Sequence, residues 1–161
     1  MPKLIKLAFT THKGNLGIQQ NFTPIDKLTK YFNFKQALSG KTNIGILYNV
    51  EFLEYFLRYS NYIKDKKFTY FYDSKVDRNL GFKLMMYYKF DDIEFVSIED
   101  NNVKEKLMSK HFDIIFTNPP YNKGLDRELI CDLINYNVTD KIVCIHPANY
   151  LTNKKSENTF N

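Results

Sequence analysis

Short apolar runs of strand type alternate along this chain with longer segments whose apolar residues recur at helical spacing. Each run is rich in β-branched or aromatic residues and ends on polar or turn-forming ones, which is typical of buried strands. The five predicted strands are residues 43–49, 67–73, 92–100, 112–117 and 141–147. The pattern therefore predicts a sheet with helices between its strands.

The first helix is predicted to begin within Thr23-Pro24-Ile25-Asp26, with Thr23 as the N-cap and Pro24 at the first helical position. It is expected to run to about Leu38, where Ser39-Gly40 close it. The remaining predicted helices are 50–60, 77–88, a short one that ends at Lys110, and 126–137. Strands and helices thus alternate regularly, which indicates an α/β protein.

Parallel neighbouring strands need a crossover connection, which is normally right-handed, so this alternation predicts a mostly parallel, doubly wound sheet of Rossmann-like type. No linker rich in Gly, Pro or Ser divides the chain. A single domain is expected, with residues 1–22 as an N-terminal arm, 23–153 as the βα core and 154–161 as a tail.

Ligands of such sheets lie off the carboxyl ends of the strands, near the point where the strand order reverses. Asp73, Asp100 and Asn118 each stand where a predicted strand stops. The three side chains are therefore expected to face one crevice.

Composition adds few constraints. The chain has 161 residues, of which 43% are hydrophobic and 25% charged, and this suits one globular domain with its own core. The net charge of +5 is compatible with DNA or RNA as a partner, although the lysine-rich composition could produce it without one.

Cys131 and Cys144 have no Cys or His companion at ligand spacing, so two reduced thiols and no metal site are expected. The N-terminus lacks the apolar core of a secretory signal, and no segment has the apolar length of a membrane span. We expect a cytoplasmic protein without a membrane partner.

The strongest chemical signal is Asn118-Pro119-Pro120-Tyr121, directly after the strand predicted at 112–117. An Asn side chain and a neighbouring backbone carbonyl offer two acceptors, and prolines with fixed φ hold them in place. Such a pair suits both hydrogens of one planar amino group, which it would make more nucleophilic. The ring of Tyr121 offers a face on which a flipped base can stack.

The segment DIIFTNPPY, residues 113–121, resembles the catalytic motif of S-adenosylmethionine-dependent amino-methyltransferases, above all the N6-adenine DNA methyltransferases. The resemblance implies that Asn118 and the Pro119 carbonyl hold the target amino group, that Pro120 stiffens the loop and that Tyr121 stacks on the base. It also implies S-adenosylmethionine as cofactor, DNA as partner and a role in restriction-modification.

The resemblance extends over roughly residues 20–153. Asp73 stands where the family has an acid for the ribose hydroxyls of the cofactor, and Asp100 where it has one for the adenine amino group. Phe22-Thr23-Pro24 is similar to the family's segment along the methionine part, and residues 141–153 resemble its fifth strand and the following loop. The implied cofactor-binding residues are Thr23, Pro24, Asp73, Asp100 and Asn118.

Two departures from the family pattern matter. The first strand should end in a Gly-rich D-x-x-x-G-x-G turn, because a Cβ would collide with a cofactor at closest approach. Residues 46–52 stand there instead, with Gly45 too early.

The chain also ends just after the fifth strand, where the family continues with two more strands and a target-recognition segment, so the sheet is expected to be incomplete at its C-terminal end. We expect the chain alone to bind the cofactor weakly or not at all.

Three hypotheses follow. The chain is an amino-methyltransferase for DNA adenine, completed by a second chain that supplies the missing strands and target recognition. Alternatively, it is a methyltransferase-derived binding protein that has lost the cofactor and acts on DNA or on a restriction-modification system. The third hypothesis is methylation of another planar amino group, in RNA or on a protein glutamine.

Overall fold

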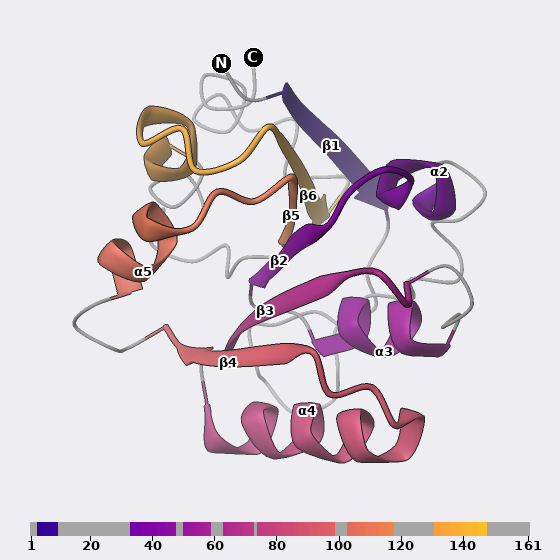
Figure 1. Cartoon of the computed structure of the whole chain (residues 1–161). Helices are drawn as coiled ribbons and strands as arrows, with labels where there is room; N and C mark the ends of the chain where they lie inside the picture. Colours follow the sequence, from indigo (N-terminus) through magenta and orange to yellow (C-terminus); the bar gives the residue numbers. More distant parts are fainter. Residues whose placement is uncertain are drawn as a thin grey trace.

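The computed structural model describes residues 3–9, 33–47, 50–58, 63–72, 74–98, 103–117 and 131–147. These residues form one sheet of six strands in the order β1-β6-β5-β2-β3-β4, with every pair of neighbours parallel. Helices cover both faces of the sheet (Figure 1). The prediction of a mostly parallel, doubly wound sheet is therefore confirmed.

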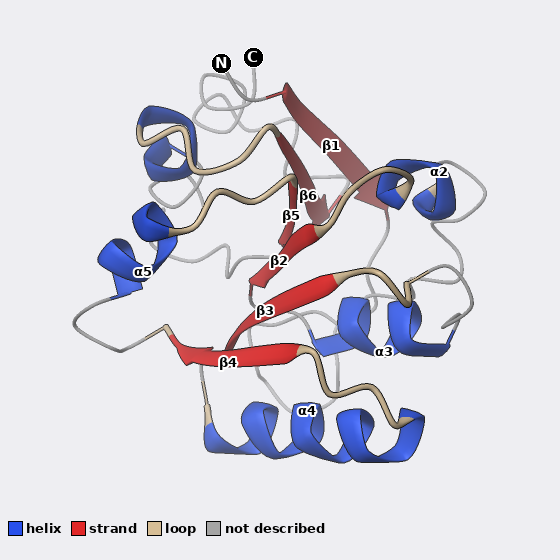
Figure 2. Ribbon diagram, viewed as in Figure 1, coloured by secondary structure: helices blue, strands red, loops and turns tan. Residues whose placement is uncertain are grey.

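The strands follow the predicted segments closely apart from β1, whereas the first predicted helix differs. Figure 2 shows the helices and strands of the described residues. The strands are β1 (Lys3–Phe9), β2 (Asn43–Leu47), β3 (Lys67–Tyr72), β4 (Ile93–Ser97), β5 (Ile114–Thr117) and β6 (Lys141–Pro147). The helices are α2 (Phe34–Leu38), α3 (Val50–Arg58), α4 (Lys75–Tyr88), α5 (Val103–Ser109) and a further helical segment, 131–135. Five of the six strands lie within the predicted ranges.

The strand β1 was not predicted from the sequence, which indicated no strand within residues 1–22. It pairs in parallel with β6, from Lys3 opposite Lys141 to Phe9 opposite Pro147, and forms one edge of the sheet. Lys3 and Lys6 interrupt its apolar pattern, which hides the strand in the sequence. Lysines are common on edge strands, where they discourage pairing with other chains.

The predicted first helix does not run unbroken to Leu38. Asn33 has an extended backbone, with φ of −88° and ψ of 94°, and its side chain accepts a hydrogen bond from the Gln36 N–H at 3.0 Å. Asn is a strong N-cap, so a helix begins after this residue rather than passing through it. The predicted close is confirmed, since Ser39 caps the helix and Gly40 has a φ of +73°.

Two hydrophobic cores lie on the two faces of the sheet. On the face covered by α2 and α3, the buried ring of Phe116 in β5 lies 5.2 Å from the ring of Phe52 and 4.9 Å from that of Phe56. The Phe34 ring of α2 lies 5.9 Å from Phe116 as well. These contacts fix the strand β5 against the helical layer, and β5 is the strand that precedes Asn118.

Asp113 joins β5 to β2 at the edge of the sheet where the strands begin. Its carboxylate accepts hydrogen bonds from the backbone N–H groups of Thr42 and Asn43, at 2.8 and 3.0 Å. Partial burial raises the pKa of Asp113, but these two bonds and the charges of Lys41 and His111 outweigh it and hold the pKa below its ordinary value. A group that is more acidic in the folded protein stabilises it in the ionised form.

We expect Asp113→Asn to lower the free energy of unfolding at pH 7 by about 1 kcal/mol, because the amide is a weaker acceptor for the two N–H groups. The contribution of Asp113 is present above the ordinary aspartate pKa of about 3.9 and is lost as the pH falls through the lower folded value. Urea unfolding at pH 7 and at pH 2 measures this. Asp91→Asn, at an exposed position before β4, is the matched control and should change nothing. An equal loss at both pH values would contradict the assignment.

Candidate active site

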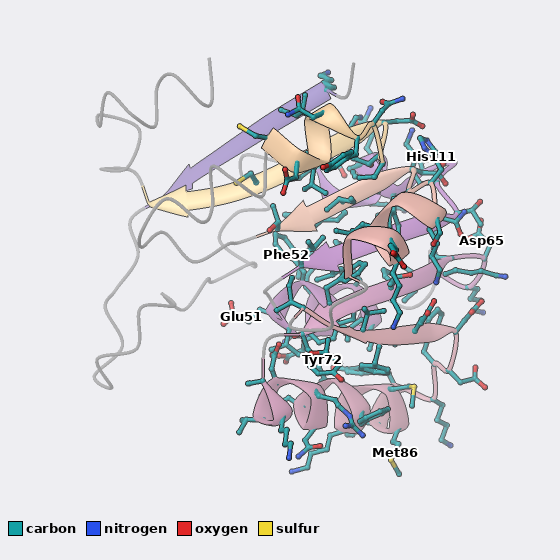
Figure 3. The ribbon with its side chains drawn as sticks, turned by 90° about the vertical axis from the view of Figure 1, so that its left-hand side faces the viewer. Glu51, Phe52, Asp65, Tyr72, Met86 and His111 are labelled. Carbon is teal, nitrogen blue, oxygen red and sulfur yellow. The ribbon has the colours of Figure 1, made fainter. Side chains whose placement is uncertain are left out.

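The strands of the sheet end together at one edge, which we call the carboxyl edge. In register, Leu47 of β2 lies opposite Phe71 of β3 and Thr117 of β5, and Tyr72 of β3 lies opposite Ser97 of β4. Figure 3 shows Glu51 at this edge, with Asp65 and His111 at the opposite one. Any ligand that spans several strand ends would therefore meet β2, β3, β4 and β5 at the carboxyl edge.

The order of the strands reverses between β2 and β5. From β2 the chain continues outward to β3 and β4 on one side, then returns to place β5 on the other side of β2. Connections leave the two strands on opposite faces at such a point and open a crevice between them. The pair Leu47 and Thr117 marks this switch point at the carboxyl edge.

The helix α3 begins at the switch point, three residues after the end of β2. Its first turn places backbone N–H groups at the carboxyl edge, where they carry the positive end of the helix dipole. Glu51 lies in that turn as its acidic residue. An anionic ligand would therefore meet both favourable N–H groups and one repelling carboxylate.

Gly45 lies within β2, where it allows close packing of side chains, and it is not part of a glycine-rich turn that could bind a cofactor. A Cβ at this position would lie 3.0 Å from Cγ1 of Ile115 and 3.3 Å from Cδ1 of Phe112. The residue therefore allows β2 and β5 to pack closely on the face opposite α3. No other glycine lies between Gly45 and the start of α3, so the departure from the Gly-rich pattern stands.

The backbone on both sides of residue 73 is anchored. Before it, the carbonyl of Tyr72 accepts a hydrogen bond from Ile98 N–H at 2.8 Å, which ties the end of β3 to β4. After it, Ser74 caps α4 by accepting from the Asp77 N–H at 3.1 Å, and the buried Tyr70 hydroxyl donates to the Asp77 carboxylate. These contacts hold residues 72 and 74 at the carboxyl edge, and Asp73 itself lies outside the described residues.

Thr117 ends β5 with a buried polar group. The residue is completely buried, and its hydroxyl oxygen forms no hydrogen bond with any residue in the described part of the chain. Its register neighbours are the apolar Leu47 and the buried Cys144. A buried hydroxyl without a partner costs about 1–3 kcal/mol, so natural proteins seldom keep one away from a functional site.

We expect Thr117→Val, which keeps the shape and removes the hydroxyl, to raise the free energy of unfolding by about 1 kcal/mol or more. The matched control is Thr139→Val. Thr139 is equally buried, but its hydroxyl donates to the Lys141 carbonyl at 3.0 Å, so that variant should be destabilised. Urea unfolding of both variants decides the point. A loss of stability in Thr117→Val would mean that its hydroxyl is satisfied in solution.

The residues predicted from the family motif lie outside the described part of the chain. They are Thr23, Pro24, Asp73, Asp100, Asn118, Pro119, Pro120 and Tyr121. The structure does place the strands that lead to three of them, since β3, β4 and β5 all end at the carboxyl edge. Sequence reasoning missed Thr117, although a polar residue that closes an otherwise apolar run was a signal.

A hollow of about 390 Å³ lies at the opposite edge of the sheet. Its lining includes Lys67, Glu94, Lys110 and His111, and an ion pair joins Glu94 to Lys110. These residues precede or begin their strands, so the hollow is separate from the switch point. Within the described ranges, no cluster of His, Cys, Asp and Glu could hold a metal ion, and none of the helices has the length and apolarity to cross a membrane.

No protein-family model and no curated protein matches the chain, but solved structures do. One is a putative caffeoyl-CoA O-methyltransferase from Staphylococcus aureus, with a TM-score of 0.54 and 12% identity over 83% of this chain and 69% of that one. Another is a Podospora anserina methyltransferase solved with SAH bound, with a TM-score of 0.53 and 13% identity over 73% of this chain and 50% of that one. The chain has the methyltransferase fold.

An O-methyltransferase family protein from Burkholderia thailandensis is similar as well, with a TM-score of 0.52 and 13% identity over 70% of this chain. This chain spans 33% of that protein and half of the Podospora protein. At these low identities, the similarity indicates a shared fold and nothing more.

Proposed function

We propose that this chain is the catalytic domain of an S-adenosylmethionine-dependent amino-methyltransferase that acts on the N6 amino group of adenine in DNA. The observation that carries the proposal is the position of β5. It lies beside β2 at the switch point, and the Asn-Pro-Pro-Tyr sequence follows its last residue, Thr117. The motif thus begins where this fold places its ligands.

The described residues fit a cofactor at the switch point. The N–H groups in the first turn of α3 face the carboxyl edge, and the hydroxyl of Thr117 is a buried polar atom at the same edge, without a partner among the described residues. By resemblance, Asp73 and Asp100 would hold the ribose and the adenine of the cofactor, and Thr23 and Pro24 would lie along its methionine part. When bound, the cofactor supplies an electrophilic methyl group.

The protein's own contribution is to hold the target amino group. The Asn118 side-chain carbonyl and the Pro119 backbone carbonyl each accept one hydrogen of that group. Both acceptors draw electron density toward the nitrogen and keep its lone pair directed at the methyl donor. Pro119 and Pro120 remove backbone freedom from the loop, and Tyr121 stacks on the flipped base.

The runner-up is a binding protein of methyltransferase fold that has lost the cofactor. The connection between Leu47 and Val50 favours it, because it is short and carries Tyr48 and Asn49 where the family has glycines. The third hypothesis, methylation of another planar amino group in RNA or on protein glutamine, also fits the fold. The similar structures include an O-methyltransferase family protein and a precorrin methyltransferase, so this fold serves substrates other than DNA.

The test is transfer of a tritium-labelled methyl group from S-adenosylmethionine to unmethylated DNA, total RNA and protein in parallel. Label recovered as N6-methyladenine from digested DNA supports the proposal. Label in RNA or on protein glutamine would identify that molecule, rather than DNA, as the substrate. An absence of label in all three, with no cofactor binding, would leave the binding protein as the function.

A further inference from the structure

The helix α4 is long and packs on the core through the partly buried Leu84 and Tyr88. Of its 14 residues only Gly81 is buried, whereas the nine-residue α3 buries Phe52, Leu53, Phe56 and Leu57. Surface helices of globular proteins usually bury an apolar stripe and expose a polar face. The outer side of α4 therefore departs from the pattern that α3 follows.

Close contacts nevertheless hold α4 firmly on the sheet. A Cβ at Gly81 would lie 2.7 Å from Cε1 of Phe95 in β4, so any larger residue would force the Phe95 ring to shift. The rings of Phe82 and Phe95 are 4.3 Å apart. Ser74 caps the start of the helix, and Lys89, with a φ of 55°, caps its end. The outer side of α4 is thus a fixed surface.

Large apolar side chains cover this outer side. Val76 is 71% exposed, Leu80 45%, Met86 75% and Tyr87 79%. Val76, Leu80 and Tyr87 follow helical spacing and form one stripe, and Figure 3 shows Met86 at the outer end of the molecule, away from the sheet. Apolar patches of this kind on a folded domain mark contact surfaces.

The charges on the outer side of α4 are positive. Lys83 lies within the stripe and Lys75 beside it, and among the described residues neither forms an ion pair. Arg78 lies on another side of the helix, where its guanidinium is 5.1 Å from the centre of the Phe82 ring. Asp77, the acidic residue of the helix, already accepts the Tyr70 hydroxyl. A second copy of this chain would oppose like charges, so the surface is complementary to an acidic partner.

We propose that α4 is the docking surface for an acidic amphipathic helix of another polypeptide. The stripe from Val76 to Tyr87 is about 16 Å long, which corresponds to three turns of a partner helix. Aliphatic Val76 and Leu80 offer no face for base stacking, which disfavours a nucleic acid. Lys83 interrupts the apolar stripe, which disfavours insertion into a membrane but suits a glutamate on a facing helix.

The probe is a fluorescein-labelled synthetic 18-residue helix with leucines at helical spacing and glutamates on both flanks. Its matched control has lysines in place of the glutamates. Fluorescence anisotropy with the full chain should give binding of the acidic peptide that is at least about tenfold tighter than that of the basic one, and salt should weaken it.

Two variants locate the site on α4. We expect Leu80→Ser combined with Tyr87→Ser to weaken binding of the acidic peptide by about tenfold or more, and Lys83→Glu to weaken it several-fold. Tyr136→Ser, at a residue 47% exposed away from α4, is the matched control and should bind normally. All four positions are on the surface, and circular dichroism checks that the three variants are folded.

Several outcomes would overturn the proposal. Equal binding of both peptides, no binding at millimolar peptide, or normal binding by the two α4 variants would each remove it. A dimer in sedimentation that Leu80→Ser with Tyr87→Ser dissociates would identify a second copy as the occupant. Flotation with phosphatidylserine vesicles, but no peptide binding, would identify a membrane. None of these results depends on methyl transfer.

Discussion

Replacing Asn118 by alanine is expected to lower the rate of methyl transfer by at least about 100-fold, by analogy with the loss of one hydrogen-bond partner of a transition state. The variant loses the side-chain acceptor for one hydrogen of the target amino group, while the backbone acceptor at Pro119 remains. The effect should fall on the rate at saturating DNA more than on DNA binding, because the acceptor acts mainly as the nitrogen changes geometry. Single-turnover transfer of labelled methyl groups measures it.

The matched control for this experiment is Asn122→Ala, four residues further along the same segment. It removes the same chemical group outside the motif and should retain nearly full activity. Tyr121→Ala is expected to weaken binding of the flipped base by about 1–3 kcal/mol, a smaller effect of a different kind. Retained methyl transfer in Asn118→Ala would show that the motif is only a turn.

The second large effect concerns the cofactor. We expect the isolated chain to bind S-adenosylmethionine no more tightly than about 100 μM, or about −5.5 kcal/mol, because side chains occupy the turn where the family has glycines. Glu51 is expected to add to this weakness. Its carboxylate lies in the first turn of α3 at the switch point, where it would repel the carboxylate of the cofactor's methionine part. Glu51→Gln should therefore tighten binding by about fivefold, which corresponds to roughly 1 kcal/mol of relieved repulsion.

Calorimetric titration of the wild type and the variant provides the measurement. Glu54→Gln is the matched control: Glu54 lies one turn further along α3 and pairs with Arg58 at 2.9 Å, so its change should leave the affinity for the cofactor unaltered. Because an acidic first turn stabilises a helix, Glu51→Gln should also lose a few tenths of a kcal/mol in stability. Micromolar binding by the wild type would overturn the expectation.

The sequence predicts local structure well where one run of residues decides it. The runs before Asp73 and Asn118 are apolar, β-rich and closed by polar or proline residues, and β3 and β5 lie within the predicted ranges. Prediction from the sequence fails where the structure of a segment depends on a partner that is distant in the sequence. The strand β1 exists because β6 offers it an edge, and nothing within residues 1–22 specifies that pairing.

The candidate site shows the same division. The tetrapeptide that starts at Asn118 identifies a chemistry from neighbouring residues alone. The switch point between β2 and β5 is a property of strand order, which the alternation of strands and helices leaves open. Thr117 shows the same limit for a single residue. Among the described residues its hydroxyl has no hydrogen-bond partner, and this depends on buried neighbours in other strands, which the local sequence does not reveal.

The pairing of β1 with β6 has a consequence for synthesis on the ribosome. Residue 141 is made roughly 10 s after its partner, residue 3, at ordinary rates of translation. During that interval β1 has no edge to join, and the strand must avoid pairing with other nascent chains on the same message. Lysines within such a strand, here Lys3 and Lys6, oppose association of identical unpaired strands because their charges repel. The pairing of β1 with β6 therefore cannot form until β6 has been made.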